Sequence, residues 1–311
     1  MPTYPPAPAT LSGQLLTIHR MLQSPAVITQ RLRTIRDLGF VADELLTQRF
    51  RTAGGAVSYE VDQPLFTDRE VQAVAPGSEY PRALTPQGQA ALAAVSKWGQ
   101  AVRITDERIK RSVPMGNAVD QTLRIVVNTV IQKVDRLAIA AVASSVSQAV
   151  EGTNWTNETG SKILLDLEKA KAKISDLEMG YSPNAVLLST TKYAHLVSDD
   201  KIATLRRREA TDNPVYGGTI EEIAGLRVLR VPLGYMPGGT DDVWVVDTRM
   251  LGGMADEADV DPGYATSDSG VQVQTERIAN KDAFDVWARR ITVPVVTSPS
   301  AAVKITGTSG S

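Results

Sequence analysis

Residues 117–149 read NAVDQTLRIVVNTVIQKVDRLAIAAVASSVSQA, a run of 33 residues whose apolar side chains recur at the spacing of one helix face. At 1.5 Å per residue, a single helix of this length would be about 50 Å long. A compact chain of 311 residues has a radius of gyration of about 20 Å, so the helix would span the whole molecule. The segment therefore predicts a flat or elongated subunit of the kind that tiles, rather than a rounded enzyme.

The two sides of this predicted helix differ in polarity. One stripe is apolar and consists of Val119, Leu123, Val126, Val127, Val130, Val134 and Leu137. The opposite side is polar and carries Asp120, Arg124, Asn128 and Gln132. This pattern indicates a helix that lies on a sheet and faces water on its other side. A coiled coil is the alternative, but the β-branched positions drift away from strict heptad spacing.

The composition is that of an ordinary folded protein. Hydrophobic residues make up 42% and charged residues 22% of the chain, which predicts one or two packed units. The net charge of −2 provides no overall field toward nucleic acid or anionic lipid. With no cysteine and two histidines, disulfides, thiolate metal sites and a His-rich metal site are excluded. The chain has no secretory signal and no long uncharged apolar run, so we expect a soluble protein without a membrane partner.

The first 52 residues combine a proline-rich tail with a basic helix. Four prolines within residues 1–10 exclude a helix there, and we expect the tail to act as a strap on a neighbouring subunit. The residues expected to make this contact are Tyr4, Pro5 and Pro6. Residues 26–38 predict a short helix that carries Arg31, Arg33 and Arg36. These arginines fit an inward-facing basic arm, but a solvated helix face is the commoner meaning of a modest charge run.

Residues 53–104 contain strands and turns but few large apolar side chains. Strand-like pieces occur at 57–61, 71–75 and 92–104, separated by prolines and glycines. About fifty such residues cannot bury a core of their own, so they are either disordered or lie on another surface. The strand periodicity favours an extended arm that grips a neighbour over a floppy loop. The expected apolar anchors are Leu65 and Phe66, and the expected ion-pair partners are Arg69, Glu70 and Arg82.

Residues 151–253 predict an α/β unit. Its expected elements are a helix at 161–178, short helices over 190–208, and strands at 185–189, 226–231 and 243–247. The strands are continuous apolar runs, which indicates a sheet covered on both faces. Farther on, residues 270–278 and 283–293 predict an antiparallel hairpin, and the tail from Thr297 is rich in serine, threonine and glycine.

No constellation typical of catalysis occurs in the chain. Nucleophile-elbow, Walker, dinucleotide-binding and zinc-protease patterns are all missing, so we expect no enzyme and no cofactor. His195 stands alone on a short helix, where a histidine is most often structural or exposed.

Two charged clusters remain to be explained. An acidic cluster could bind calcium, but its spacing favours a solvated turn. It comprises Asp256, Glu257, Asp259 and Asp261. A basic cluster in the α/β unit comprises Arg206, Arg207 and Arg208. It could meet phosphates, but with no aromatic platform beside it we favour a solvated or inter-subunit patch.

Four segments, in order along the chain, carry a family resemblance. Residues 74–81 (VAPGSEYP) and 97–110 (KWGQAVRITDERIK) form the first pair, and residues 183–193 (PNAVLLSTTKY) and 223–232 (IAGLRVLRVP) the second. The first pair resembles the second half of the extended loop and the start of the spine helix in the major capsid protein of tailed bacteriophages, the Hong Kong 97 fold. The second pair resembles the axial domain of that family. The ordered series is the evidence, because shell proteins have no catalytic signature.

The resemblance implies an α+β chain of Hong Kong 97 type. An N-arm at 1–24 and an extended β-loop at 53–104 would reach out of the body, and an α/β axial domain would occupy 151–253. The peripheral domain would consist of three pieces: an N-terminal helix and incoming strand at 25–52, the spine helix at 105–150, and the C-terminal hairpin and tail at 254–311. Its spine helix would lie on an antiparallel sheet. The implied function is self-assembly into hexamers and pentamers of an icosahedral phage head around double-stranded DNA. The head would assemble in the host cytoplasm and become the virion capsid. The implied partners are other copies of the chain, a portal and packaged DNA bound non-specifically.

Two departures from the family matter. Some members form a lysine–asparagine isopeptide bond from the extended loop, but the first lysine here is Lys97, beyond the expected loop tip. We therefore expect non-covalent interlocking. Some members carry a long cleaved N-terminal scaffold, whereas about 25 residues precede the first helix here, so we expect a separate scaffolding protein. Two alternatives stay open: an encapsulin-like nanocompartment shell, and an oligomeric enzyme with a β-arm.

Overall fold

The computed structural model describes residues 40–112, 118–157, 161–202, 219–237, 241–257, 263–266 and 270–309. The helices described are α3 (Val41–Leu45), α4 (Asp106–Ser112), α5 (Ala118–Ser145), α6 (Ile163–Ser175) and α7 (Thr190–Ser198). The strands are β1 (Gln48–Thr52), β2 (Ala56–Val61), β3 (Gln89–Ala94), β4 (Ser96–Thr105), β5 (Ala149–Glu151), β6 (Ala185–Ser189), β7 (Glu222–Ile223), β8 (Leu226–Val231), β9 (Val243–Val246), β10 (Gly252–Glu257), β11 (Ala265–Thr266), β12 (Gln272–Ile278), β13 (Ala283–Val296) and β14 (Ala302–Thr306).

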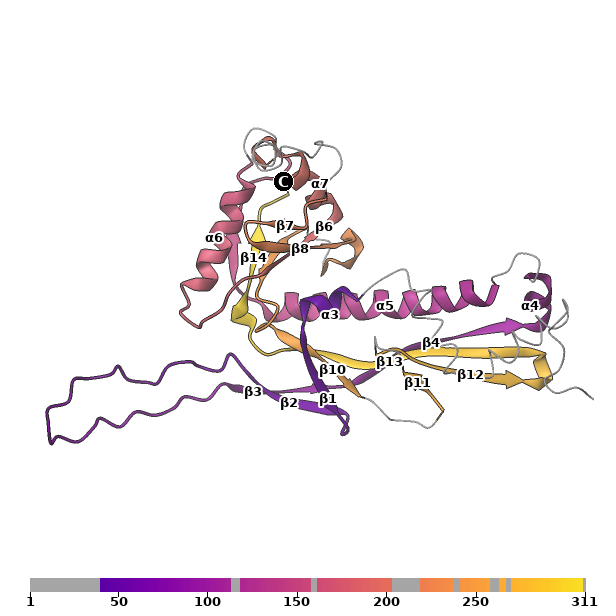
Figure 1. Ribbon diagram of the computed structural model, residues 1–311, viewed down its shortest axis with the longest axis horizontal. Coiled ribbons are helices and arrows are strands. Elements are labelled where there is room, and N and C mark those ends of the chain that lie inside the picture. Colours follow the sequence, from indigo (N-terminus) through magenta and orange to yellow (C-terminus); the bar gives the residue numbers. More distant parts are fainter. Residues whose placement is uncertain are drawn as a thin grey trace, which may run out of the picture.

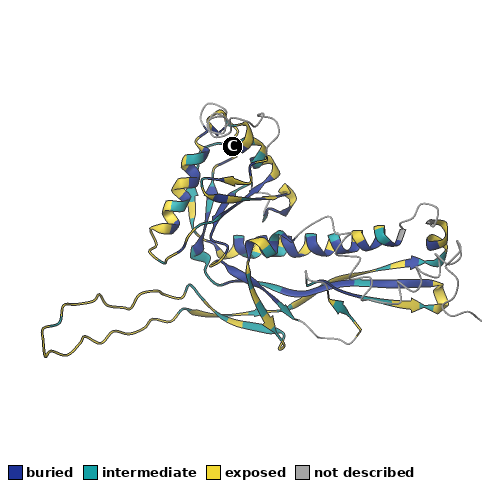
Figure 2. Ribbon diagram, viewed as in Figure 1, coloured by how far each residue is buried: buried dark blue, intermediate teal, exposed yellow. Residues whose placement is uncertain are grey.

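The long helix α5 has 28 residues and is therefore about 42 Å long. Its buried stripe, from Val119 to Val142, packs on β4 and β13, and buried and exposed positions alternate along the helix (Figure 2). Arg124 and Ile125 are exposed. The prediction of an amphipathic helix on a sheet is confirmed. The helix ends at Ser145 rather than at the predicted Ala149, because Ala149–Glu151 leave it to pair with β14 as strand β5.

The sheet under α5 has the order β1-β10-β13-β12-β11, and β4 pairs with the other edge of β13. β12 and β13 form the predicted antiparallel hairpin, with a turn at Ala279–Lys281. β4 runs antiparallel to β13 over its whole length, from Ser96 to Thr105. Residues 96–104 are therefore part of this sheet, whereas the sequence placed them in the extended loop.

A glycine allows β1 to enter this sheet beside β10. The two strands are parallel, with Gln48 opposite Gly253. A Cβ atom on Gly253 would clash with the carbonyl oxygen of Gln48. Because β1 directly precedes β2, this close contact fixes the place from which the extended loop departs.

The second sheet has the order β5-β14-β9-β6-β8-β7. On one face, Val186 and Leu188 pack with residues of α6 and α7. On the other face, Leu187 and Trp244 join the core that contains the buried stripe of α5. The sheet is thus covered on both faces, as its apolar strands predict.

Strand β14 corrects the assignment of the C-terminal tail. The sequence grouped residues 302–306 with the peripheral domain, but they lie between β5 and β9 in the second sheet. Val303 and Ile305 are fully buried there. This short strand was missed because serine, threonine and glycine surround it, and its partners are distant in sequence.

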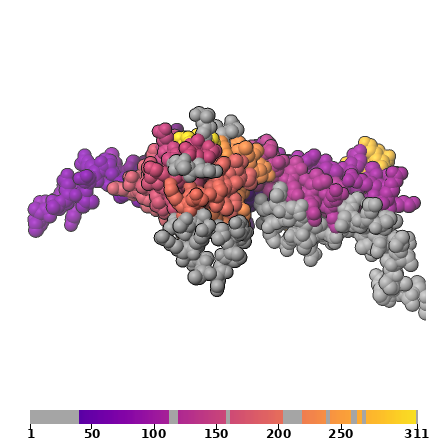
Figure 3. Space-filling view, turned by 90° about the horizontal axis from the view of Figure 1, so that it is seen from above, coloured from indigo at the N-terminus to yellow at the C-terminus, as the bar shows by residue number. Residues whose placement is uncertain are grey.

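The molecule is elongated. In Figure 1 the second sheet with α6 and α7 stands over one end of α5, and the β2–β3 hairpin points away from the other sheet. The view from above in Figure 3 shows the same long outline, with the hairpin projecting from one end of the body.

Candidate interaction site at the extended loop

The extended loop begins and ends in a two-stranded sheet of its own. β2 and β3 pair in antiparallel register from Ala56 opposite Ala94 to Val61 opposite Gln89. Between them, residues 62–88 contain no helix or strand and reach far from the body (Figure 1). The strand expected at 71–75 is wrong, because an alternating pattern without a neighbouring strand has nothing to pair with.

Large apolar side chains on this loop face water. Leu65 is 61% exposed and Phe66 is 58% exposed, and Val71, Tyr80 and Leu84 are exposed to a greater degree. Such a concentration of exposed apolar groups on a segment without a core is typical of an interaction surface. The expected anchors Leu65 and Phe66 are accessible for such a contact, and their role remains a prediction.

Few polar contacts stiffen the loop internally. The Asp68 carboxylate accepts a hydrogen bond from the Leu84 N–H at 2.8 Å and so ties the two sides together. Arg82 pairs with Glu79 at 3.2 Å, but both side chains are almost fully exposed, so the pair contributes little stability. Arg69 and Glu70 are exposed as well. The loop therefore holds a partly fixed shape and leaves its ionic groups accessible.

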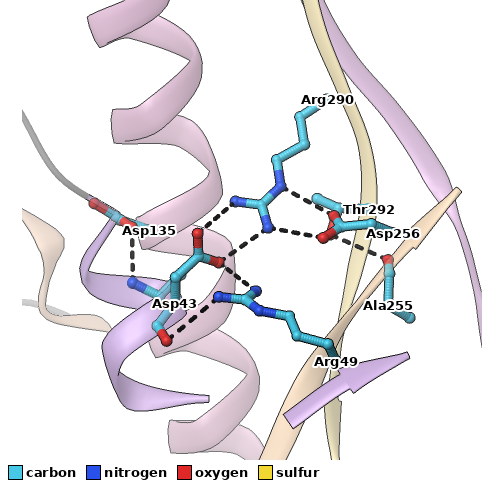
Figure 4. Close-up of polar contacts among 8 residues, drawn as sticks. Asp43, Arg49, Asp135, Ala255, Asp256, Arg290 and Thr292 are labelled. Carbon is cyan, nitrogen blue, oxygen red and sulfur yellow. Dashed lines mark hydrogen bonds and ion pairs between the residues drawn. The ribbon is translucent and has the colours of Figure 1, made fainter. Parts of the chain in front are cut away.

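Beneath α5, the buried Arg290 joins the elements that lead into the loop (Figure 4). Its guanidinium donates to Asp43 of α3 at 2.9 and 3.3 Å and to Asp256 of β10 at 3.0 Å through two nitrogens. It also stacks on the Phe40 ring, 4.4 Å from the centroid. Asp43 accepts another hydrogen bond from Arg49 of β1 at 2.7 Å. The only sequence signal for this site was a pair of arginines within the otherwise largely apolar strand β13.

Asp135 holds the start of α3 against the middle of α5. Its carboxylate is buried and accepts a hydrogen bond from the Ala42 N–H at 2.9 Å. Burial raises the pKa of Asp135 to about 6, although hydrogen bonds from the backbone of Ala42 and Val41 oppose that rise. Above this pH the α3–α5 contact contains a buried negative charge.

Several predicted contacts lie outside the described residues. These are Tyr4, Pro5, Pro6, Arg31, Arg33, Arg36, Arg206, Arg207 and Arg208. In the acidic cluster, Asp256 lies in β10 and pairs with Arg290, so the expectation of a solvated turn is wrong for this residue. Over the described ranges, no three metal-ligating side chains are placed to hold an ion. Within those ranges, too, every helix is too short or too polar to cross a membrane.

Comparison with known proteins bears on the whole architecture. A family model described as phage capsid protein matches residues 89–305, more than two thirds of the chain. A phage-related protein from Bordetella bronchiseptica has 13% identity and a TM-score of 0.57, with 90% of this chain and 95% of that chain covered. The capsid of cyanophage P-SCSP1u has 12% identity and a TM-score of 0.58, with 86% and 88% covered.

The SrpI encapsulin of Synechococcus elongatus has 14% identity and a TM-score of 0.54, with 88% of each chain covered. At these identities the matched structures show a shared fold. None of the curated protein sequences matches the chain at a significant level.

Proposed function

This chain belongs to the phage capsid protein family, and we propose that its copies form the hexamers and pentamers of an icosahedral head that encloses double-stranded DNA. Membership makes it a structural protein of the virion capsid shell rather than an enzyme, and the predicted fold of Hong Kong 97 type is confirmed by capsid structures. In the proposal, the extended loop of each subunit lies on a neighbouring subunit.

The exposed apolar surface of the loop is the observation that carries this proposal. Each side of the loop has about 13 residues and, fully extended, can reach about 43 Å, close to the length of α5. One loop is therefore long enough to lie across a neighbouring subunit. Obligate interfaces bury about 2,000 Å² or more. Because each subunit both gives and receives a loop, many modest contacts become collectively hard to reverse.

The proposed shell is held without covalent links. Residues 62–88 contain no lysine, and Lys97 lies in β4 opposite Ile291 of the same chain. Boiled particles should therefore run on a denaturing gel at the chain mass of 33.4 kDa. A ladder of covalent multimers would contradict non-covalent interlocking.

The remaining partners belong to the proposal as well. They are a separate scaffolding protein, a portal and the packaged DNA, with assembly in the host cytoplasm. The packaged DNA is proposed to be held through non-specific contacts to its phosphates.

Replacing residues 63–87 with Asn-Gly tests the loop. This turn closes a two-stranded hairpin and keeps β2 and β3 in register. We expect the variant to fold, by circular dichroism, but to form no closed shells in size-exclusion chromatography and electron microscopy. Leu65→Ser with Phe66→Ser should also reduce shell yield, whereas the matched apolar pair Leu65→Ile with Phe66→Leu should assemble. Closed shells from the loop replacement would overturn the proposal.

An encapsulin-like shell is the second candidate, because the SrpI encapsulin shares the fold. The content of purified particles separates the two. Nuclease-protected double-stranded DNA supports a phage head, and packaged protein without DNA supports a compartment.

A further inference from the structure

Asp62, the first residue after β2, fastens the base of the extended loop to a distant part of the chain. Its N–H donates to the carbonyl oxygen of Thr297 at 2.9 Å. Its carboxylate accepts hydrogen bonds from the Ser300 N–H at 3.3 Å and from the Ser300 hydroxyl at 2.9 Å. The loop is thus anchored outside its own hairpin.

The backbone of Asp62 has a left-handed conformation, with φ at +46°. Aspartate tolerates this region better than most residues but does not favour it. The conformation turns the chain at the point where β2 ends. The contacts with Thr297 and Ser300 therefore impose the direction of the loop, since local preference alone would not.

The segment that receives Asp62 is the crossover between the two sheets, residues 297–301, which joins β13 to β14. The crossover is itself held firmly. The Thr297 N–H donates to the Leu251 carbonyl oxygen at 3.0 Å, and the Ala301 carbonyl oxygen accepts from the Asp247 N–H at 2.9 Å. The base of the loop consequently moves with the crossover.

We propose that Asp62 is the positioning residue of the extended loop and that its clasp on Ser300 couples the direction of the loop to the crossover between the two sheets. The inference rests on the proposed function, because direction matters when the far end must meet a neighbour. With about 43 Å of extended chain, a rotation of about 10° at the base moves the far end by about 7 Å. A displacement of that size would carry the loop off its contact surface.

Distances between spin labels in the unassembled chain test the clasp. The chain has no cysteine, so Ser78→Cys at the far turn of the loop and Lys169→Cys on α6 give a single labelled pair. Labelled chain is diluted into an excess of unlabelled chain, so that distances within one chain are measured. Ser300→Ala is the deciding variant, because it removes the hydroxyl donor and alters nothing within the loop. Asp62→Gly removes the carboxylate and still permits the left-handed backbone.

Ser58→Ala, at an exposed serine on β2, is the matched control. Ser300→Ala and Asp62→Gly should each widen the distance distribution at least twofold relative to the control, with unchanged circular dichroism. An unchanged width in Ser300→Ala overturns the proposal, even if Asp62→Gly widens it, because glycine alone adds flexibility. If Asp62→Gly does not fold, Ser300→Ala decides. The distance measurement requires no assembly. Closed shells from the loop replacement would therefore overturn the proposed function without affecting the interpretation of the spin-label distances.

Discussion

Replacing Asp135 with asparagine tests how α5 holds the start of α3. The buried carboxyl group has its pKa raised by burial from 3.8 to about 6. Because the folded state then binds the proton more tightly than the unfolded state, this group stabilises the fold fully below about pH 4, and that stability is lost as the pH rises through about 6. A shift of about two pKa units corresponds to about 3 kcal/mol.

Asparagine cannot ionise, and its amide oxygen can still accept the hydrogen bond from the Ala42 N–H. The free energy of unfolding of D135N should match that of the unsubstituted chain near pH 4 and exceed it by up to about 3 kcal/mol near pH 7.5. Urea denaturation of the unassembled chain across this pH range measures the difference. D176N, at the exposed end of α6, is the control, because it removes a carboxylate from the surface rather than from the interior. A D135N difference that stays flat or falls with pH would refute the reasoning.

Two further substitutions test how the elements before the loop are held. Arg290→Ala leaves the carboxylates of Asp43 and Asp256 without their shared cation. The free energy of unfolding, measured by urea denaturation, should fall by about 3 to 5 kcal/mol. Arg290→Lys keeps the positive charge but loses the paired N–H donors of the guanidinium, so its free energy of unfolding should lie between those of the alanine variant and the unsubstituted chain. Equal losses in the lysine and alanine variants would argue against the paired geometry. Gly253→Val places a side chain against the Gln48 carbonyl oxygen and should detach β1. Limited proteolysis should then cut next to β1 faster than in the unsubstituted chain, and an unchanged cleavage rate would contradict this.

The features predicted correctly are those with a local pattern. The helical spacing of apolar residues in α5 extends over 28 residues, and the β12–β13 hairpin has alternation on both sides of a short turn. The buried strands β6 and β9 are apolar runs with turn signals beside them. In each case neighbouring residues contain the whole signal, so one sequence is enough.

The features that were missed depend on residues far apart in the chain. The hydrogen bond from Ala42 to Asp135 joins positions separated by 93 residues, and the pair of Arg290 with Asp43 spans 247. Neither has a local signature. Likewise, β4 could be recognised as a strand, but its membership of the main sheet follows from pairing with β13. An alternating pattern of apolar and polar residues indicates which side chains share one face of a strand. It does not indicate whether a partner strand exists.

The distribution of polar contacts explains how an extended loop can serve assembly. Buried ties hold the chain before the loop, at Asp135 and Arg290, and the clasp at Asp62 holds its base. Beyond Asp62 the loop has few contacts with its own body. A loop that packed on its own subunit would have to break those contacts before it could bind a neighbour. A loop fixed at its base and bare beyond it keeps its apolar surface available, and its restricted direction lowers the entropy lost on binding. Substitutions at the base should therefore alter the geometry of the shell, whereas substitutions at Leu65 or Phe66 should alter its strength.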